Sequence, residues 1–281
     1  MSIQLRFVVI YLSVFLLSII ASTNLSKYYF VVPESPENVL AEYNNDWAFM
    51  FVWIILGAVL MYSIIKSPFS KVLIKLIELT IVFTATSLLL YSFLLPLLEE
   101  QSYTIGIMGG LIVVLLRMLG KYRNEIATLS TAGVAALLGF GLTPLSSLML
   151  MGALAVYDYI AVFKTKHMQV LARELNKEET TFSIKEKEKR VVDGKVKEEF
   201  IEMGTGDLLI PALVASSFAK VSFLYSFSTI VGTFIGFSIL LFTLKRYQKI
   251  LPAIPFLFIG IMLSLAMFIL LDSLYFLYIL N

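Results

Sequence analysis

Cysteine is absent from the 281-residue chain, and histidine occurs once, as His167. The lack of cysteine excludes disulfides, thiolate-bound iron–sulfur clusters and catalysis by a thiol. A single histidine argues against a histidine-rich metal site and against a Ser-His-Asp triad, and we interpret His167 as a surface residue. Charged residues make up only 15% of the chain, whereas about 25% is usual in soluble domains.

Apolar residues are abundant instead. They make up 59% of the chain, and the mean hydropathy is +0.88, which is typical of proteins that cross a membrane several times. Crossing a hydrocarbon core of ~30 Å takes roughly 17–25 residues. We therefore expect an all-α polytopic membrane protein with nine transmembrane helices, at about residues 5–23, 47–65, 72–97, 103–119, 125–142, 145–163, 204–219, 222–244 and 252–273.

These nine helices fall into two groups separated by a charged segment. Residues 1–163 hold the first six, 164–203 form a charged loop, and 204–281 hold the last three. Pro144 separates the fifth helix from the sixth, because proline breaks a helix. The first apolar run, which Arg6 precedes, also fits a cleaved signal peptide, but its length favours a retained helix.

Lysine and arginine are distributed unequally between the two sides of the predicted membrane. Of the 22 such residues, all but Lys27 and Lys220 lie on the same side as the N-terminus. Positively charged residues favour the cytoplasmic side. We therefore predict a multi-pass protein of the cell membrane with a cytoplasmic N-terminus, a cytoplasmic 164–203 loop and an external C-terminus.

Carboxylates are rare in the expected helices, where an ionised aspartate at a helix centre costs ~2.5–3.5 kcal/mol. Three of them have ordinary structural explanations. Glu78 follows Lys75 by three residues, so the two can form an ion pair on one helix face. Glu125 begins a helix, where an acid complements the helix dipole. Asp272 lies ~30 Å beyond Pro252, at the opposite interface.

Asp158 and Asp207 have no such explanation. Asp158 precedes Lys164 by six residues and lies ~9 Å below the inner surface, whereas Asp207 follows Glu202 by five residues and lies ~8 Å deep. Neither has a basic residue three or four positions away. Two carboxylates at one depth on successive antiparallel helices can share a proton, so we hypothesise a functional pair. The alternative is that each carboxylate bonds separately to hydroxyl or backbone groups.

Small and helix-breaking residues surround Asp207. Gly204 and Gly206 remove side chains just before it, which lets another backbone approach the aspartate and favours a site open to substrate. Pro211 cannot supply the N–H that the carbonyl of residue 207 would normally receive, so we expect the helix to be loosened.

Three motifs lie at similar depth in the sixth, seventh and ninth expected helices: Tyr157-Asp158, Gly204-Thr205-Gly206-Asp207, and Leu251-Pro252-Ala253-Ile254-Pro255. In order and placement they resemble the YD, GxGD and PAL signatures of presenilins and signal peptide peptidases. The third motif departs from the family pattern, because Ile254 replaces leucine and moves the branch to Cβ. A literal Pro-Ala-Leu at 211–213 lies on the seventh helix, which is not the family position.

The resemblance extends over the whole nine-helix layout and implies an intramembrane aspartyl endopeptidase. It implies Asp158 and Asp207 as the catalytic residues, with a water between them and no metal or organic cofactor. It implies substrate binding or active-site support by Tyr157, Gly204, Thr205, Gly206, Leu251, Pro252, Ala253 and Ile254. The implied partners are single-span or signal-peptide-like substrates in the lipid bilayer, and not nucleic acid. The predicted orientation and compact length resemble archaeal presenilin homologues, which implies that accessory subunits are not required and leaves a homo-oligomer open.

The charged loop contains a hairpin signal. Asp193-Gly194 favours a two-residue turn between the strand-capable stretches 190–192 and 195–197. We hypothesise that this hairpin leads into the seventh helix and offers an edge to which an extended substrate adds as a strand. The alternative is a solvated linker of mixed charge.

Other functions stay open from the residues alone. A transporter or ion channel can use Asp158 and Asp207 as a proton or cation relay, but such sites favour the membrane midplane and internal repeats, and no repeat is evident. A prepilin-peptidase-like enzyme shares GxGD but not the motif at 251–255. A scaffold would carry the acids without chemistry.

Overall fold

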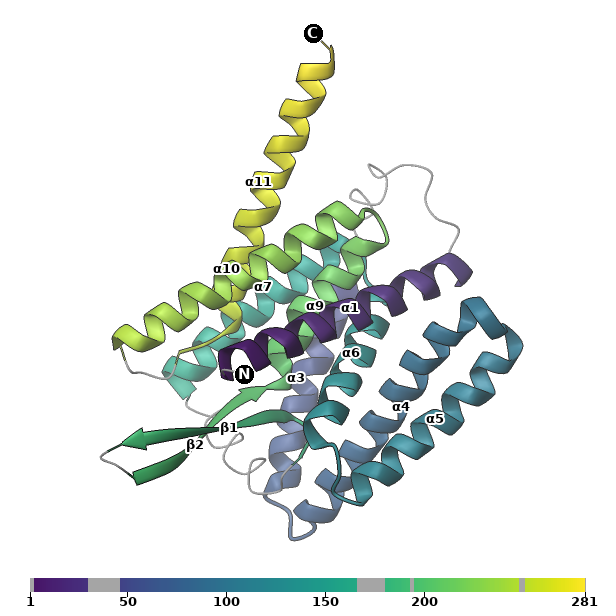
Figure 1. The fold of residues 1–281 in the computed structure, drawn as a ribbon, viewed down its shortest axis with the longest axis vertical. Coiled ribbons are helices and arrows are strands. Elements are labelled where there is room, and N and C mark those ends of the chain that lie inside the picture. The colour runs from purple at the N-terminus through teal and green to yellow at the C-terminus, as the bar shows by residue number, and fades with distance from the viewer. Residues whose placement is uncertain (1–2, 30–45, 166–179, 193–194, 248–250, 281) are drawn as a thin grey trace.

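The computed structural model describes residues 3–29, 46–165, 180–192, 195–247 and 251–280, which form nine α-helices and a two-stranded sheet (Figure 1). The helices are α1 (Ile3–Tyr29), α3 (Asp46–Ile65), α4 (Ser70–Leu98), α5 (Glu100–Met118), α6 (Arg123–Gly141), α7 (Pro144–Ile160), α9 (Thr205–Ala219), α10 (Phe223–Tyr247) and α11 (Ile254–Leu280). A π-helical turn, Ala161–Thr165, extends α7, and the strands are β1 (Ser183–Val192) and β2 (Lys195–Gly204).

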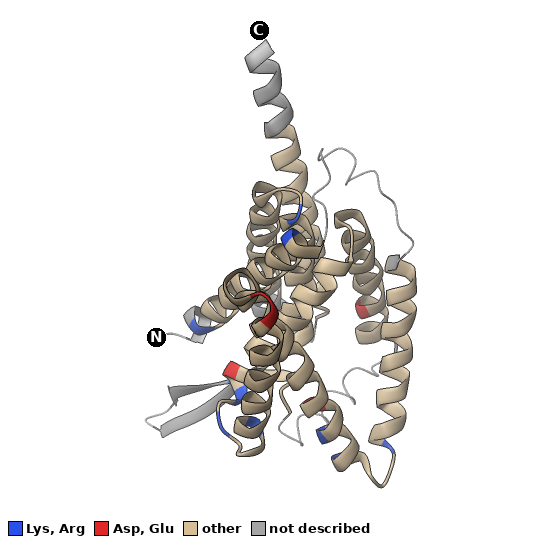
Figure 2. Cartoon of the chain, turned by 90° about the vertical axis from the view of Figure 1, so that its right-hand side faces the viewer, with Lys and Arg blue, Asp and Glu red and all other residues tan. Residues whose placement is uncertain are grey.

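Seven of these helices are long and apolar enough to cross a membrane, and charged residues are sparse along them (Figure 2). The other two are α6 and α9, which pack against each other and are flanked by α1. In addition, α4 packs on α6, and α7 and α10 pack on α9. Because neighbouring helices shield them from lipid, α6 and α9 need fewer large apolar side chains. The predicted all-α polytopic fold with nine helices and a short hairpin is confirmed.

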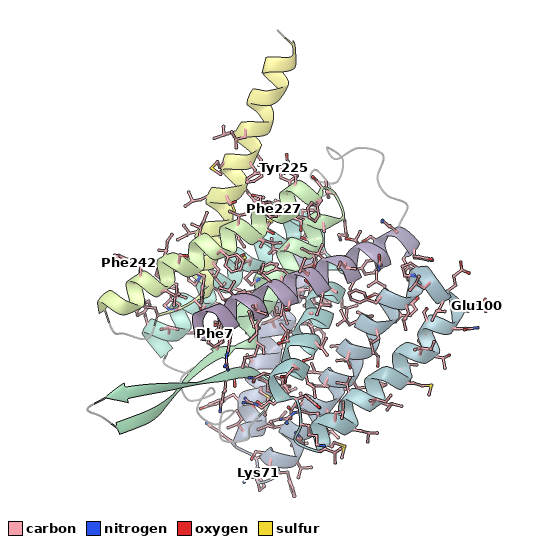
Figure 3. The ribbon with its side chains drawn as sticks, viewed as in Figure 1. Phe7, Lys71, Glu100, Tyr225, Phe227 and Phe242 are labelled. Atoms are coloured by element: carbon pink, nitrogen blue, oxygen red, sulfur yellow. The ribbon has the colours of Figure 1, made fainter. Side chains whose placement is uncertain are left out.

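The core of the bundle is centred on α9. Ten of its fifteen residues are buried, and side chains of α1 and α10 pack against it (Figure 3). Val14 and Phe15 on α1 are fully buried, whereas Phe242 on α10 is 68% exposed and points away from the bundle. The helix continues through Pro211, so the proline does not end it. Contacts with α1, α6, α7 and α10 hold α9 together although one backbone hydrogen bond cannot form.

The break between α6 and α7 follows from Thr143 and Pro144. Thr143 is extended, and its hydroxyl accepts a hydrogen bond from the backbone N–H of Ser146 at 3.2 Å, as expected of a helix N-cap. Pro144 occupies the first turn, where its missing N–H costs nothing. The predicted boundary at Pro144 is therefore confirmed.

The hairpin prediction is also confirmed, with longer strands than the sequence indicated. Ten residue pairs form the antiparallel ladder, from Ser183 opposite Gly204 to Val192 opposite Lys195, which leaves two residues for the turn. The ladder therefore brings the chain directly to the start of α9. The turn residues 193–194, His167 and the side chain of Asp272 lie outside the described part of the chain.

Candidate active site

Asp158 lies in the last turn of α7. Its side chain is buried, with 9% exposed. The backbone changes from α-helical to π-helical at Ala161, three residues later, and the N–H of Ala161 donates to the carbonyl oxygens of Asp158 and Tyr157. Short π-helical turns are rare in proteins and are frequent at functional sites. Tyr157 is half-buried beside Asp158.

The start of α11 contacts Asp158 directly. The backbone N–H of Ile254 donates to the Asp158 Oδ2 atom at 3.2 Å. The preceding residues, Leu251 to Ala253, are not helical, and Pro252 is buried. Because the first N–H groups of a helix have no partner within it, they are free to bind a carboxylate. The structure thus brings the 251–254 segment and Asp158 together although 96 positions separate Ile254 from Asp158.

Asp207 lies in the first turn of α9, where a negative charge complements the helix dipole. The hairpin determines where this turn begins. Both the backbone N–H and the hydroxyl of Thr205 donate to the Phe182 carbonyl at 3.0 Å, and Gly204 ends β2 as the N-cap of α9. The position of Asp207 therefore depends on the pairing of β1 with β2.

The helices that carry the two aspartates pack against each other. Ser147, near the start of α7, lies 2.7 Å from Ser217, near the end of α9, so the two helices run antiparallel. Asp158, near the end of α7, and Asp207, near the start of α9, therefore lie at the same end of this helix pair. Within the described residues, no group of three or more His, Cys, Asp or Glu side chains lies close enough to hold a metal ion.

Gly204 and Gly206 leave room beside Asp207. Within the described part of the chain, a Cβ atom added to Gly206 would meet no heavy atom within 4 Å, and one added to Gly204 would meet only the Asp207 Oδ2 atom, at 3.8 Å. No backbone of the described residues enters this space, so the two glycines leave it open beside the aspartate.

Two further buried groups were not anticipated from the sequence. Tyr11 on α1, a helix that packs on α9, is only 2% exposed, and its ring centroid lies 5.3 Å from that of Phe237. A tyrosine in an apolar helix gives no signal of such a contact. The Lys75–Glu78 ion pair is confirmed at 2.9 Å, but Glu78 also binds Arg117, at 2.8 Å, from α5. Arg117 is 39 positions away, beyond any local pattern.

Comparisons with known proteins agree with the fold. A family model described as signal-peptide peptidase, presenilin aspartyl protease matches residues 5–272. Two solved structures of a presenilin family intramembrane aspartate protease, in space groups C222 and P2, superpose with TM-scores of 0.58 and 0.60. They share 22% and 24% sequence identity and cover 93% and 92% of this chain and 95% and 94% of their own. A search of curated proteins gave no match. By its family match over nearly the whole length, the chain belongs to the signal peptide peptidase and presenilin family of aspartyl proteases.

Proposed function

We propose that the protein is an endopeptidase that hydrolyses peptide bonds within transmembrane segments, with Asp158 and Asp207 as its catalytic residues. The observation that carries the proposal is the antiparallel packing of α7 and α9, which have Asp158 and Asp207 at the same end, in a chain of an aspartyl protease family. The proposal includes a cytoplasmic N-terminus in the cell membrane, which the distribution of lysine and arginine supports.

The proposed reaction requires one ionised and one protonated aspartate. The ionised carboxylate takes a proton from a water molecule, and the water oxygen attacks the scissile carbonyl carbon. The protonated carboxyl group donates its proton to the carbonyl oxygen. The tetrahedral intermediate then collapses as the carbon–nitrogen bond breaks. The leaving nitrogen receives the proton that the first carboxylate took from water, and the second carboxylate takes back its proton as the carbonyl re-forms. The supporting roles of Tyr157, Gly204, Thr205, Gly206 and residues 251–254 belong to the same proposal.

Replacing either aspartate tests this function. We expect Asp158→Asn and Asp207→Asn to lower the cleavage rate of a purified single-span substrate by about 10²–10⁴-fold or more, since proton transfer by each group would be lost. A matched control is Glu125→Gln, an acid in the first turn of α6 that lies outside the proposed pair. A substrate mimic with a hydroxyl at the scissile carbon is expected to inhibit the wild type.

The contrary results are equally definite. Cleavage by either aspartate variant at the wild-type rate would exclude the proposed pair. An intact substrate with wild type and variants alike would favour the proton- or cation-coupled transporter.

We further propose that an extended substrate adds to the outer edge of β2. Hydrogen-bonded and non-hydrogen-bonded residue pairs alternate along an antiparallel ladder. The Thr205 N–H donates to the Phe182 carbonyl. Three positions along, Lys185 on β1 and Glu202 on β2 therefore form a non-hydrogen-bonded pair, whose backbone groups point away from the partner strand. On β1 this outward edge is occupied, because Asn124 bonds both the N–H and the carbonyl of Lys185, at 3.3 and 2.8 Å. The β2 edge, which ends beside Asp207, is the one that supports strand addition.

Cysteine cross-linking distinguishes the two edges without background, because the chain contains no cysteine. Lys185 and Glu202 lie opposite each other, so Lys185→Cys and Glu202→Cys form a matched pair. In an Asp158→Ala background, which keeps the substrate whole, we expect substrate cysteines near the scissile bond to cross-link only to Glu202→Cys. Preferential cross-linking to Lys185→Cys would refute addition to β2, and the absence of cross-links to either strand would refute strand addition altogether.

A further inference from the structure

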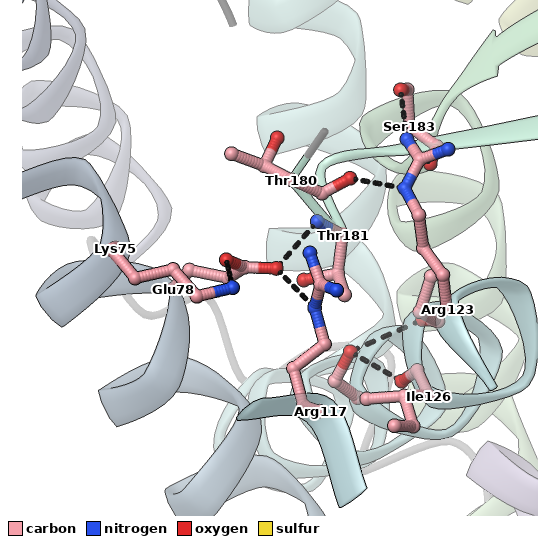
Figure 4. Close-up of polar contacts among 10 residues, drawn as sticks. Lys75, Glu78, Arg117, Arg123, Ile126, Thr180, Thr181 and Ser183 are labelled. Carbon is pink, nitrogen blue, oxygen red and sulfur yellow. Dashed lines mark hydrogen bonds and ion pairs between the residues drawn. The ribbon is translucent and has the colours of Figure 1, made fainter. Parts of the chain in front are cut away.

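A buried carboxylate in the transmembrane bundle binds the segment that leads into the hairpin (Figure 4). Glu78 on α4 is fully buried, and its Oε2 atom accepts a hydrogen bond from Lys75 Nζ at 2.9 Å. Its Oε1 atom accepts two more, from Arg117 Nε and from the backbone N–H of Thr181, both at 2.8 Å. An ion pair between α4 and α5 does not require the third contact. Glu78 therefore has a partner outside these two helices.

The start of α6 holds the same segment from another side. Arg123 donates through Nε to the Thr180 carbonyl at 2.9 Å and through Nη2 to the Ser183 carbonyl at 3.0 Å (Figure 4). Asn124 bonds the backbone of Lys185, as described above. Together these contacts fix main-chain atoms on both sides of Phe182, from residue 180 to residue 185.

The tight connection between α5 and α6 places the two arginines together. Only residues 119–122 separate the helices, and within them Gly120 and Tyr122 adopt left-handed conformations with φ of 73° and 55°. Such an angle is easily reached by glycine but is uncommon for tyrosine. This conformation lets Arg117 reach Glu78 while Arg123 reaches the chain before β1.

Only a short path leads from Glu78 to Asp207. Thr181 binds Glu78 through its N–H, and the next residue, Phe182, binds Thr205 through its carbonyl. Thr205 is the first residue of α9, which carries Asp207 in its first turn. Two hydrogen bonds and one peptide unit thus connect the buried carboxylate of α4 to the helix of the proposed catalytic residue.

We propose that Glu78 is a positioning residue for proteolysis, which holds Thr181 and thereby sets the location of Asp207. The proposal rests on the function proposed above. A buried ion pair is itself weak evidence for a role in stability, because replacing both partners by apolar residues of similar volume is often neutral. The geometry of reacting groups is far more demanding, since a misplacement of about 1 Å can cost ~10²-fold in rate.

The double variant Glu78→Met/Arg117→Met separates the two roles. It removes both members of the buried ion pair and, with them, the acceptor for Thr181. We expect its melting temperature to fall only modestly, because one buried N–H loses its acceptor, and its kcat to fall by about 10- to 100-fold with an almost unchanged KM. Glu78→Gln keeps an acceptor oxygen and is expected to restore most of kcat. Lys75→Met, which removes a partly exposed ion-pair partner only, is the control and is expected to retain the wild-type kcat.

A second variant covers the case in which the double variant does not fold. Asn124 is only partly buried, and Asn124→Ala releases Lys185 without placing a charge in the bundle. We expect it to lower kcat about tenfold at an unchanged melting temperature. A folded double variant with the wild-type kcat would overturn the proposal. If the double variant is unfolded, the wild-type kcat in Asn124→Ala would overturn it. An equal loss of kcat in Glu78→Gln would also overturn it, because the charge would then matter and not the acceptor. None of these results bears on whether Asp158 and Asp207 are catalytic, which their own substitutions decide.

Discussion

Serine hydroxyls make the direct polar contacts between α9 and its neighbours. Ser22 on α1 donates to the Ser216 carbonyl at 3.2 Å, and Ser226 on α10 donates to the Ala215 carbonyl at 2.8 Å. Ser147 on α7 lies 2.7 Å from the Ser217 hydroxyl. Small hydroxyl residues allow close helix packing in a membrane and still supply a hydrogen bond. They therefore fix the helix that carries Asp207 without introducing further charges.

Lys220 makes a different contact at the opposite end of α9. Its Nζ atom donates to the carbonyl oxygens of Phe140 and Leu142, at 2.8 and 2.6 Å, where α6 ends. The last carbonyl groups of a helix lack partners within it and favour a cation. Lys220 lies in the connection between α9 and α10, and burial lowers its pKa to about 8.

This lowered pKa predicts a dependence of stability on pH. Between pH 8 and 10.5 the unfolded chain still binds the proton that folded Lys220 has released, so the free energy of unfolding rises with pH through this group. Below pH 8 the lysine is charged in both states and its contribution is constant. We expect Lys220→Met to abolish this rise in the free energy of unfolding with pH. Lys27→Met, at an exposed position, is expected to retain it, and melting temperatures from about pH 7 to pH 11 measure both. Parallel pH profiles for the wild type and Lys220→Met would contradict the prediction.

At the level of elements, α10 and α11 pack unusually closely. Gly232 and Gly236 on α10 face Gly260 and its neighbours on α11. A Cβ atom at Gly232 would lie 2.5 Å from the Ile261 Cα atom and 2.7 Å from the Gly260 carbonyl oxygen, and both of these are backbone atoms that cannot rotate away. Small residues at such a contact let two membrane helices gain van der Waals contact along their backbones. The position of α11, whose first N–H groups face Asp158, depends on this contact.

We therefore expect Gly232→Ala to destabilise the protein by about 1–3 kcal/mol through overpacking. The matched control is Gly57→Ala on α3, where, among the described residues, an added Cβ would meet nothing within 4 Å. Alanine is expected to be neutral or slightly stabilising there, because it lowers the entropy cost of the helix. Denaturation of both purified variants measures the difference, and equal stability would show that the two helices can separate without cost.

At the level of the whole molecule, the sequence predicted the features that depend on local patterns. The number of helices follows from runs of apolar residues, the break before α7 from Pro144, and the hairpin from Asp193-Gly194. The Lys75–Glu78 pair follows from helical spacing. Each of these depends on residues close together in the chain, so no knowledge of packing was needed.

The features that the sequence did not reveal depend on contacts between distant segments. Arg117 and Thr181 reach Glu78 across 39 and 103 positions, and nothing in the local sequence marks them as partners. Pro211 lies inside α9 without ending it, because the surrounding helices hold α9 in one piece. Gly204 and Gly206 leave room for another backbone, and among the described residues that space is open. In each case the contact or the backbone conformation depends on how distant segments pack, which the local sequence does not determine.

The shortness and extensive burial of α9 also have a consequence for biosynthesis. Its 15 residues extend over about 22 Å, less than the ~30 Å of a hydrocarbon core, and it carries an aspartate in its first turn. Such a segment gains little by entering lipid alone, so we expect it to be inserted together with the longer α10 that follows it. Among the described residues, six helices precede it, and three of them, α1, α6 and α7, pack against it. The ribosome thus synthesises α1, α6 and α7, which contact α9, before it synthesises α9 itself.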